Sequence, residues 1–505
     1  MRLKDLLETV KVKEMTGPDE IEITGLSYDS RKVSKGDIFF ALNGAHNDGT
    51  QFAAQAVSNG ALCIISGSKI KDCNVTNVIV DDINGVMAEI AAKFYDYPDK
   101  KLFIIGVTGT NGKTSITYMT ESLFKSLNVD IGVIGTISYR YANTVIDAPN
   151  TTPQSIDLYK MMSEIVKAKI KYLIMEVSSH ALVLKRTAKI EFDVAVFTNL
   201  TRDHLDFHKN MDNYFNAKKS LFDSLSNNLK NNKKYAIINV DDVYGKKLFD
   251  DKNTNVTKIA YSVKNKEGKF YSFAEDIVLN GKGSSFKLNS SFGAKAEIKT
   301  SHIGLHNVYN VLATFCICAA AGFDFKTVIE KLELVTGAPG RLEPVKSDKD
   351  FSVIVDYAHT DDALKNVLSA IKNLKPAKII TVFGCGGNRD KTKRPLMAKV
   401  ACNMSDFVFI TSDNPREENP VEIAEDVEKG AKEINKTNYK VIIDRKQAIT
   451  EAIKSAKNGD AVLIAGKGHE NYQIIGTEKI HFDDREIAYE ILNGKTVFTE
   501  SSVTE

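Results

Sequence analysis

The sequence predicts an α/β protein of three domains, with a central P-loop parallel sheet and a C-terminal Rossmann-like α/β domain. Its 505 residues suffice for three domains at roughly 100–200 residues each. An apolar run at 102–107 leads into a glycine-rich turn and then into a helical pattern at 113–127. Beyond residue 340, apolar runs of strand length alternate with helical stretches, which is typical of a parallel sheet. We expect domains at 1–98, 99–335 and 336–505.

The first domain is expected to mix short strands with one helix, and it ends at a charged turn that begins with Pro98. Its strand patterns lie at 38–42, 63–65 and 77–80, and its helical pattern lies at 85–95.

The central domain continues from the run at 102–107 and contains further strand and helix patterns. The stretch between 225 and 300 is rich in Asn, Lys, Ser and Gly, which predicts peripheral hairpins. The segment 335–340 holds two glycines and a proline, which a helix interior or central strand does not accommodate, so we place the second boundary there. The other patterns are strands at 172–175 and 194–197 and a helix at 306–321.

The third domain carries the alternating pattern most clearly, and it predicts parallel strands joined by helices. The expected strands lie at 352–355, 378–383, 407–411, 440–443 and 461–465.

The composition is that of an ordinary folded protein. Hydrophobic residues make up 43% and charged residues 26% of the chain, which argues against disordered, collagen-like and coiled-coil classes. Lys and Arg number 67 and Asp and Glu 65, so the net charge is only +2 and does not favour nucleic acid. No apolar stretch spans a bilayer, the N-terminus lacks a signal-peptide core, and the six cysteines form no CxxC pair. We expect a cytoplasmic protein with no nucleic-acid partner and no membrane insertion.

Residues 106–114 read GVTGTNGKT between a strand and a helix, the setting that a phosphate-binding loop requires. Glycines allow the loop N–H groups to face phosphate oxygens, the lysine reaches the β and γ phosphates, and the final threonine can bind Mg²⁺. Val107 stands where strict Walker spacing has glycine, so the loop is a variant; an ordinary glycine-rich turn is the alternative. Kinase, ATPase and ligase chemistry all remain open. The expected ATP contacts in the loop are Thr108, Gly109, Thr110, Asn111, Gly112, Lys113 and Thr114.

Two further strand ends carry groups that can bind a metal. Glu176 follows the strand at 172–175, where a second Mg²⁺ ligand belongs, although a helix cap is the alternative. The segment 198–206, TNLTRDHLD, follows the strand at 194–197. Its His204 would, taken alone, more often be a surface histidine.

These motifs together resemble the Mur ligase family over nearly the whole chain. They are GTNGKT, EVSSH at 176–180, TNLTRDHLD with Ala217-Lys218, His306-Asn307 with Asn310, Gly340-Arg341, and DYAH at 356–359. The resemblance implies an ATP-dependent ligase of peptidoglycan precursor synthesis. ATP would phosphorylate the D-glutamate carboxylate of UDP-MurNAc-L-Ala-D-Glu, and an incoming amine would then attack the acyl phosphate.

The resemblance also implies roles for individual residues. Thr114 and Glu176 would hold one Mg²⁺, and His204 would help to hold a second together with Lys218 as an anionic carbamate. Without the family, Lys218 would be interpreted as part of a solvated helix face. Lys113, Lys218, His204 and Glu176 are the expected catalytic residues, and the nucleotide would also contact Asn307, Arg341, Asp356 and His359.

The resemblance places the UDP precursor against the first domain and the start of the central one, although a polar hairpin is the alternative for the first-domain segment. Arg186 suits a carboxylate or a phosphate. The expected precursor contacts are Tyr28, Ser30, Ala45, His46, Asn47, Asn150, Thr151, Thr152, Ser178 and Arg186.

The C-terminal domain would select the amino acid, because ligands of open α/β sheets bind beyond the strand ends. meso-Diaminopimelate differs from lysine by a second carboxylate, for which a guanidinium is the expected partner. The DNPR segment at 413–416 resembles the motif of the diaminopimelate-adding subgroup, and Glu470 can bind the distal ammonium. The expected contacts are Arg389, Asp413, Asn414, Pro415, Arg416, Gly466 and Glu470.

Three alternatives stay open at this point: a lysine-adding ligase, a folylpolyglutamate synthetase, and a P-loop ATPase that switches a partner protein. The last would hydrolyse ATP without amino acid or nucleotide-sugar. We expect a monomer.

Overall fold

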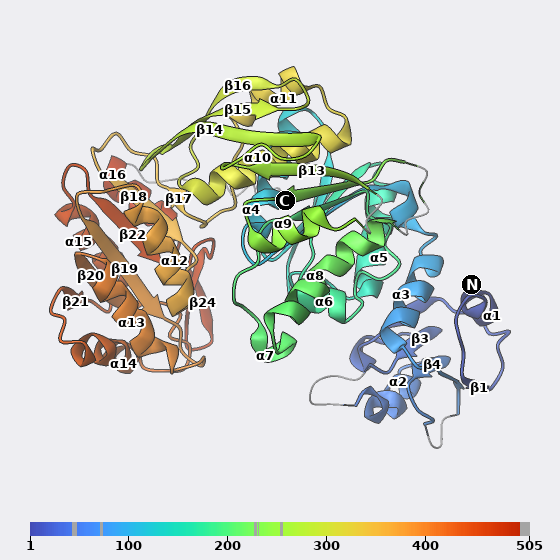
Figure 1. Ribbon diagram of the computed structural model, residues 1–505. Coiled ribbons are helices and arrows are strands. Elements are labelled where there is room, and N and C mark those ends of the chain that lie inside the picture. Colours follow the sequence, from blue (N-terminus) through green and yellow to red (C-terminus); the bar gives the residue numbers. More distant parts are fainter. Residues whose placement is uncertain (43–47, 71–73, 227–229, 231, 253–255, 495–505) are drawn as a thin grey trace. The chain divides into compact units, whose positions relative to one another are not determined.

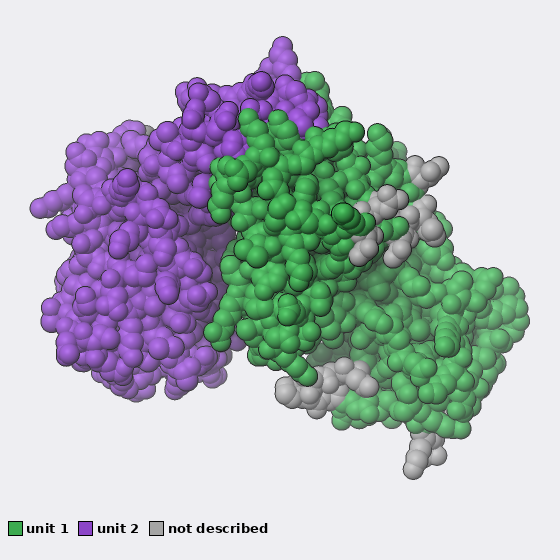
Figure 2. Space-filling model, in the orientation of Figure 1, with its two compact units in different colours: residues 1–272, 313–324 green, residues 273–312, 325–505 purple. Residues whose placement is uncertain are grey.

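The computed structural model describes residues 1–42, 48–70, 74–226, 230, 232–252 and 256–494 (Figure 1). The chain divides into two compact units, one of residues 1–272 with 313–324 and the other of residues 273–312 with 325–505 (Figure 2). The expected strands and helices outside the stretch 225–300 are confirmed, with bounds shifted by at most two residues.

The N-terminal part of the first unit is a small sheet with helices on both faces (Figure 1). Its strand order is β1-β5-β4-β3-β2, and all neighbours are parallel except β1 and β5. Alternate residues of one strand face opposite sides, so Ile38 and Phe40 pack towards α3 while Phe39 packs towards α2. The elements are α1 (Leu3–Leu7), β1 (Glu14–Thr16), β2 (Gly25–Ser27), β3 (Asp37–Phe40), α2 (Ala53–Ser58), β4 (Cys63–Ser66), β5 (Thr76–Ile79) and α3 (Ile83–Phe94).

The larger sheet of the first unit has the order β13-β12-β11-β6-β10-β7-β8-β9. All neighbours from β13 to β7 are parallel, and the antiparallel strands β8 and β9 form one edge. The carboxyl ends of β6, β10 and β11 therefore meet at one edge of the sheet. The strands are β6 (Phe103–Thr108), β7 (Ile131–Ile134), β8 (Ser138–Tyr141), β9 (Thr144–Asp147), β10 (Tyr172–Glu176), β11 (Val194–Phe197), β12 (Tyr235–Asn239) and β13 (Thr257–Ser262).

Helices connect these strands and cover the sheet (Figure 1). They are α4 (Lys113–Ser126), α5 (Ser155–Lys167), α6 (Ser179–Val183), α7 (Leu205–His208), α8 (Met211–Ser226) and α9 (Val243–Asp250).

The expectation of peripheral hairpins between 225 and 300 is wrong for its first half. β12 and β13 are buried parallel strands that continue the main sheet, even though polar residues flank them. Hydrophobic burial on the sheet overrides the polar average of the window. The second half fits the expectation, because β15 (Gly283–Ser290) and β16 (Lys295–Thr300) pair antiparallel, next to β14 (Phe270–Asn280). The helices α10 (Leu305–Ala321) and α11 (Phe325–Leu332) follow.

The C-terminal part of the second unit is the predicted parallel α/β sheet, with the order β17-β18-β22-β19-β20-β21 (Figure 1). Only the short β17 runs antiparallel to its neighbour. Helices α12, α13 and α14 share one hydrophobic core with the sheet, and α15 and α16 share another. The strands are β17 (Glu343–Pro344), β18 (Ser352–Asp356), β19 (Ile379–Cys385), β20 (Phe407–Ser412), β21 (Tyr439–Val441) and β22 (Ala461–Ala465).

The helices of this part are α12 (Asp361–Lys372), α13 (Lys393–Met404), α14 (Pro420–Glu433), α15 (Arg445–Ser455) and α16 (Asp484–Asn493), and a hairpin of β23 (Tyr472–Ile475) and β24 (Glu478–His481) precedes the last helix. The three sheets just described fall one each within the ranges 1–98, 99–335 and 336–505, whose boundaries stay a prediction. Among the described residues, no helix combines the length and the apolar character that crossing a membrane requires.

Asp193 lies just before β11, at the sheet edge opposite the phosphate-binding loop, and its side chain is fully buried. Its carboxylate accepts hydrogen bonds from the Ile104 N–H (2.7 Å), Lys230 Nζ (2.8 Å), Asn232 Nδ2 (2.6 Å) and Lys234 Nζ (3.1 Å). One buried anion thus joins β6, β11 and the segment that enters β12.

We predict that Asp193→Ala destabilises the protein by about 3–5 kcal/mol, because it removes a fully buried carboxylate from two largely buried ammonium groups. Calorimetric thermal unfolding measures this change. Asp81→Ala is the matched control, since its ion pair with Lys13 is exposed on both sides and is worth at most about 1 kcal/mol. Equal losses in the two variants would contradict the role of Asp193.

Candidate active site

The phosphate-binding loop joins the end of β6 to the start of α4 at Lys113. Gly109 has a φ of 146°, and a Cβ there would lie 1.8 Å from Thr198 Oγ1, so only glycine fits. Gly112 forms the N-cap of α4 in the left-handed region. Lys113 Nζ donates to the carbonyl oxygens of Gly109 (2.9 Å) and Thr110 (2.8 Å). The positive charge therefore lies on the loop that precedes the helix N-terminus, which suits an anion.

Residues that follow β11 hold this loop in place. The Thr110 N–H donates to the Asn199 carbonyl (2.9 Å), and the Asn111 N–H donates to Asn199 Oδ1 (3.0 Å). Thr198 Oγ1 donates to the Asn111 carbonyl (2.6 Å), and the Thr198 N–H donates to the Thr108 carbonyl (3.0 Å). The first two residues of TNLTRDHLD are thus loop supports, a role that the sequence did not reveal.

Glu176 is almost fully buried at the end of β10. Its carboxylate accepts hydrogen bonds from Thr114 Oγ1 (3.0 Å), the Thr136 N–H (2.9 Å) and Thr136 Oγ1 (3.0 Å). Thr114 and Glu176 therefore lie together, whereas Thr136 is an unpredicted member of the group. Ser178 caps α6, so the helix-cap alternative for Glu176 is wrong.

Lys218 lies on α8 with its side chain 1% exposed, so the solvated-face interpretation is wrong. Its Nζ donates to the Gly109 carbonyl (2.8 Å) and lies 4.6 Å from the centre of the Tyr214 ring. Burial lowers the pKa of Lys218 well below its ordinary value, and the charge of Lys113 lowers it further. The shift favours the neutral amine over the ammonium.

His204 begins α7 with a φ of 52°, and about half of its side chain is exposed. Its Nε2 lies 3.4 Å from Asp203 Oδ2, and its ring lies 4.9 Å from that of His180 and 6.2 Å from that of Tyr214. His204 and Lys218 therefore both contact Tyr214. In the described ranges, no three His, Cys, Asp or Glu side chains are grouped as a metal site. A cation here would also need hydroxyl, carbamate or phosphate oxygens.

Tyr28 and Ser30 lie in the N-terminal part and line a cavity of about 490 Å³ together with Phe39, Phe52 and Gln55. Tyr28 OH donates to Asp157 Oδ2 (2.6 Å), and Ser30 Oγ donates to Gln55 Oε1 (2.7 Å). A cavity of this volume is large enough for a small ligand. Ala45, His46 and Asn47 lie outside the described residues.

The other predicted precursor contacts are gathered next to Glu176. Thr152 Oγ1 donates to the Glu176 carbonyl (2.8 Å) and accepts from the Ser178 N–H (3.1 Å). Arg186 Nη1 donates to the Thr152 carbonyl (2.9 Å), while its buried Nε has no hydrogen-bond partner among the described residues. Thr151 Oγ1 lies 3.1 Å from Thr136 Oγ1, and the Asn150 carbonyl accepts from Tyr139 OH (2.5 Å).

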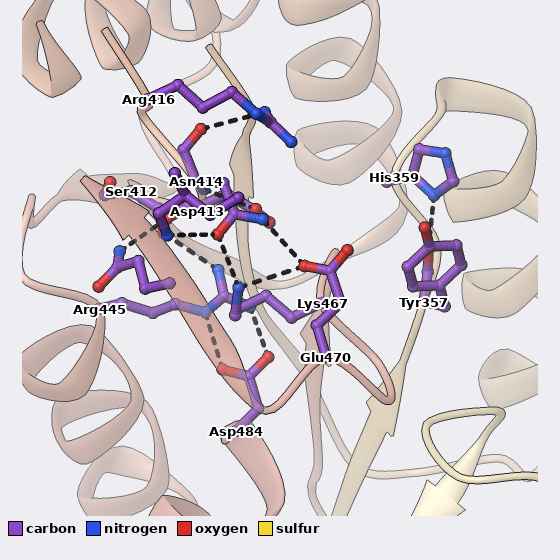
Figure 3. A network of polar contacts seen from close by, with 12 residues as sticks. Tyr357, His359, Ser412, Asp413, Asn414, Arg416, Arg445, Lys467, Glu470 and Asp484 are labelled. Carbon is purple, nitrogen blue, oxygen red and sulfur yellow. Dashed lines mark hydrogen bonds and ion pairs between the residues drawn. The ribbon is translucent and has the colours of Figure 1, made fainter. Parts of the chain in front are cut away.

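In the second unit, the DNPR segment after β20 and the segment 466–470 after β22 meet in one polar network (Figure 3). Asn414 Nδ2 donates to Glu470 Oε2 (2.9 Å), and Asn414 Oδ1 accepts from Lys467 Nζ (3.2 Å). Arg416 Nη1 donates to the Gly387 carbonyl (2.9 Å). A Cβ on Gly466 would lie 2.7 Å from Asp413 Oδ2, so the two segments approach closely. Pro415 lies between Asn414 and Arg416, against Gly387.

Beneath this network lies a buried ion pair that the sequence did not reveal. Arg445 and Asp484 are both fully buried and are joined by two hydrogen bonds of 2.8 and 2.7 Å (Figure 3). Arg445 also donates to the carbonyls of Ser412 (3.2 Å) and Ala465 (3.0 Å), the last residues of β20 and β22. The pair therefore ties together the strand ends that carry the network. Arg389, by contrast, is exposed and makes no hydrogen bond to it among the described residues.

The predicted nucleotide contacts of the second unit fall into two places. Arg341 lies over the Tyr357 ring, which also contacts His359 and His469 at 4.6 and 4.9 Å between ring centres. Tyr357 lies in the DYAH motif, but neither Tyr357 nor His469 was predicted as a site residue. Asp356 accepts from the N–H groups of Leu342 (2.7 Å) and Ala358 (2.8 Å), and burial raises its pKa. Asn307 lies elsewhere, on α10, where it bonds to Ile303 and Asn310.

Three family models match consecutive parts of the chain. They are described as Mur ligase family, catalytic domain (residues 22–95), Mur ligase middle domain (107–318) and Mur ligase, glutamate ligase domain (340–468). The chain belongs to the Mur ligase family. The predicted family and fold class are confirmed.

The relatives of this chain show which Mur ligases it is similar to. The chain is 47% identical to the UDP-N-acetylmuramoyl-L-alanyl-D-glutamate--2,6-diaminopimelate ligase of Fusobacterium nucleatum subsp. nucleatum, over 94% of this chain and 95% of that protein. It is 43% identical to the protein of the same name from Caldanaerobacter subterraneus subsp. tengcongensis, over 97% and 99%. A solved structure of a ligase with this name shares 32% identity and a TM-score of 0.72, over 98% and 99% of the two chains.

One ion-pair cluster positions the loop that carries Arg389. Glu418 accepts from Arg394 Nη2 (2.9 Å) and pairs with Lys391 (3.2 Å), and it also accepts from the Asn388 N–H. That N–H donor and the Arg394 guanidinium lower the pKa of Glu418 to about 2.

A carboxyl whose pKa is lowered on folding stabilises the protein above its unfolded pKa, and this contribution disappears as pH falls towards the folded value. We therefore predict that Glu418→Gln lowers the thermal midpoint at pH 7, and that the difference from wild type shrinks progressively below about pH 4.5. Glu425→Gln, on the exposed face of α14, is the control and should change little. A difference that is independent of pH would contradict the assignment.

Proposed function

We propose that this Mur ligase joins meso-2,6-diaminopimelate to UDP-MurNAc-L-Ala-D-Glu at the expense of ATP, forming an amide bond in peptidoglycan precursor synthesis. The names of relatives that match over nearly the full chain support this function. The observation that carries it is the convergence of Asn414, Arg416 and Glu470 beyond β20 and β22, since these groups suit a carboxylate and an ammonium.

The phosphate-binding loop suits transfer of the γ-phosphoryl group of ATP to the D-glutamate carboxylate. The loop N–H groups and Lys113 would bind the β and γ phosphates. Arg186, with its buried Nε, would bind a carboxylate or phosphate of the precursor. In the next step the amine attacks the acyl carbon, and the C–O bond to phosphate breaks as the amide forms.

The residues present fit Mg²⁺. Thr114 Oγ1 and the Glu176 carboxylate are hard oxygen donors 3.0 Å apart, and Mg²⁺ sites of this kind add substrate phosphates to one or two protein ligands. Bound there, Mg²⁺ would neutralise charge on the transferring phosphoryl group. His204 and Lys218 would hold a second ion if Lys218 is a carbamate.

The environment of Lys218 supports that carbamate. A buried lysine with a lowered pKa offers the neutral amine, the only form that adds to CO₂. The nitrogen bonds to the CO₂ carbon and loses one proton, which leaves an anionic carbamate. The product attracts a cation, whereas the ammonium would repel it.

The amino-acid site favours diaminopimelate over lysine in this proposal. Arg416 and Asn414 would bind the second carboxylate, and Glu470 would bind the ammonium beside it. Lysine lacks that carboxylate, so the Arg416 guanidinium would lose its partner. We further propose that the enzyme acts as a cytoplasmic monomer without nucleic-acid partners, which agrees with a net charge of only +2.

We predict phosphate release that depends on diaminopimelate in the presence of ATP and UDP-MurNAc-L-Ala-D-Glu, with far less release for L-lysine. Arg416→Ala should raise the KM for diaminopimelate about 10- to 150-fold, because a hydrogen bond to a charged group is lost. Arg2→Ala, exposed and distant in the chain, is the control. Equal turnover with lysine would overturn the choice of amino acid but leave the ligase reaction intact.

Lys218→Ala should reduce turnover about 100- to 1000-fold through loss of charge stabilisation, and added acetate should restore part of it. Isotope-labelled bicarbonate should give a carbamate carbon signal in the wild-type NMR spectrum that the variant lacks. Lys219→Ala is the control, since that neighbouring, partly buried lysine pairs instead with Asp223 and Asp251. Full activity of Lys218→Ala would exclude the carbamate role.

A further inference from the structure

Lys467 is a fully buried lysine in the loop after β22, and neither the motifs nor the reaction steps above use it. Its Nζ donates to Asn414 Oδ1 (3.2 Å) and lies 3.4 Å from Glu470 Oε2 (Figure 3). The centre of the Tyr472 ring lies 5.6 Å from the same nitrogen. Burial of an ammonium costs several kcal/mol unless its partners compensate. The hydrogen bonds to Asn414 and Glu470 therefore hold the Lys467 side chain in one position.

These contacts determine which way the Asn414 amide points. The oxygen and nitrogen of an Asn side chain have similar shapes, so hydrogen-bond partners decide the orientation. Asn414 Oδ1 faces two groups that can only donate, Lys467 Nζ (3.2 Å) and the Ile474 N–H (3.0 Å). Asn414 Nδ2 faces Glu470 Oε2, which accepts (2.9 Å). In the reversed amide, the NH₂ group would face the two donors, Lys467 Nζ and the Ile474 N–H, and the oxygen would face the Glu470 carboxylate.

The orientation decides what the amide offers to a ligand. Both lone pairs of Oδ1 are used, while Nδ2 has two hydrogens and only one bond among the described residues. Asn414 can therefore donate to a ligand but has no oxygen lone pair left to accept from one. A donor suits a carboxylate and not an ammonium.

The same contacts polarise Glu470. Its Oε2 receives both Asn414 Nδ2 and Lys467 Nζ, so Oε1 is the oxygen that remains for a ligand ammonium. The hairpin of β23 and β24 completes the arrangement, because Ile474 bonds to Asn414 and its carbonyl accepts from the Arg416 N–H (3.1 Å).

We propose that Lys467 is a positioning residue that sets the specificity of the amino-acid site by fixing the Asn414 amide as a donor towards the second carboxylate of the substrate. The inference rests on the proposed function, with meso-diaminopimelate as the substrate. Lys467 itself acts on the substrate only through Asn414 and Glu470. Loss of Lys467 frees the amide to rotate and weakens the distinction between diaminopimelate and lysine.

The test compares the steady-state kinetics of Lys467→Met, which keeps the side-chain length but donates no hydrogen bond, with those of the full-length wild type. We expect the KM for diaminopimelate to rise about tenfold, as for one hydrogen bond to a charged group. The preference over L-lysine should fall, while the KM values for ATP and the UDP precursor stay near wild type. Lys467→Arg, which keeps the charge and donors, should recover most of the preference.

A double-mutant cycle separates this role from a general structural one. In an Asn414→Leu background, Lys467→Met should raise the KM for diaminopimelate little further, because the amide that it positions is gone. Additive effects, an unchanged KM in Lys467→Met, or a parallel rise in all three KM values would overturn the proposal. A wild-type enzyme that does not use diaminopimelate at all would instead overturn the proposed function before any variant is tested.

If Lys467→Met does not fold, Asn414→Asp provides the test, since it leaves Lys467 paired with a carboxylate. Asp accepts from Lys467 and the Ile474 N–H but has no hydrogen to donate to the substrate. The variant should lose affinity for diaminopimelate about tenfold and shift its preference towards lysine. Unchanged affinity for diaminopimelate would show that no donor is needed and would overturn the proposal.

Discussion

Parallel pairing of β-strands is the constraint on which the arrangement of this protein depends. Every parallel strand points its carboxyl end to the same edge of its sheet, and loops far apart in the chain meet there. In the first unit, β6, β10 and β11 bring the phosphate-binding loop, Glu176 and the supports Thr198 and Asn199 together. In the second unit, β20 and β22 bring Asn414 and Glu470 together.

Charges at these edges are held by few and specific partners. Lys113 and Lys218 both donate to the Gly109 carbonyl, so two lysine side chains meet at one oxygen of the loop. Lys467 instead contacts an amide oxygen and one carboxylate oxygen. In the proposed function, a chain with a net charge of +2 would bind its strongly anionic ligands through individually placed groups and not through an overall field.

The sequence and the structure agree best where local pattern decides the outcome. The expected strand at 194–197 and the expected helix start at 113 have the same bounds in the structure, because period and turn residues are local properties. The prediction was wrong for β12 and β13, because the polar residues that flank these two buried strands dominate the local composition. It also missed Thr136, Arg445 and Lys467, since a lone polar residue carries no periodic signal before its partners are known.

The sequence is sufficient for the α/β class, the glycine-rich loop between a strand and a helix, the order of motifs at strand ends and the resemblance to the Mur ligase family. The folded chain was needed to show that Lys218 is buried against Gly109 and that Lys467 bonds to the Asn414 amide oxygen. The first contact joins residues that are 109 positions apart in the chain, and the second joins residues that are 53 positions apart. Burial and hydrogen-bond direction depend on such distant partners, whereas propensity and spacing report only on near neighbours.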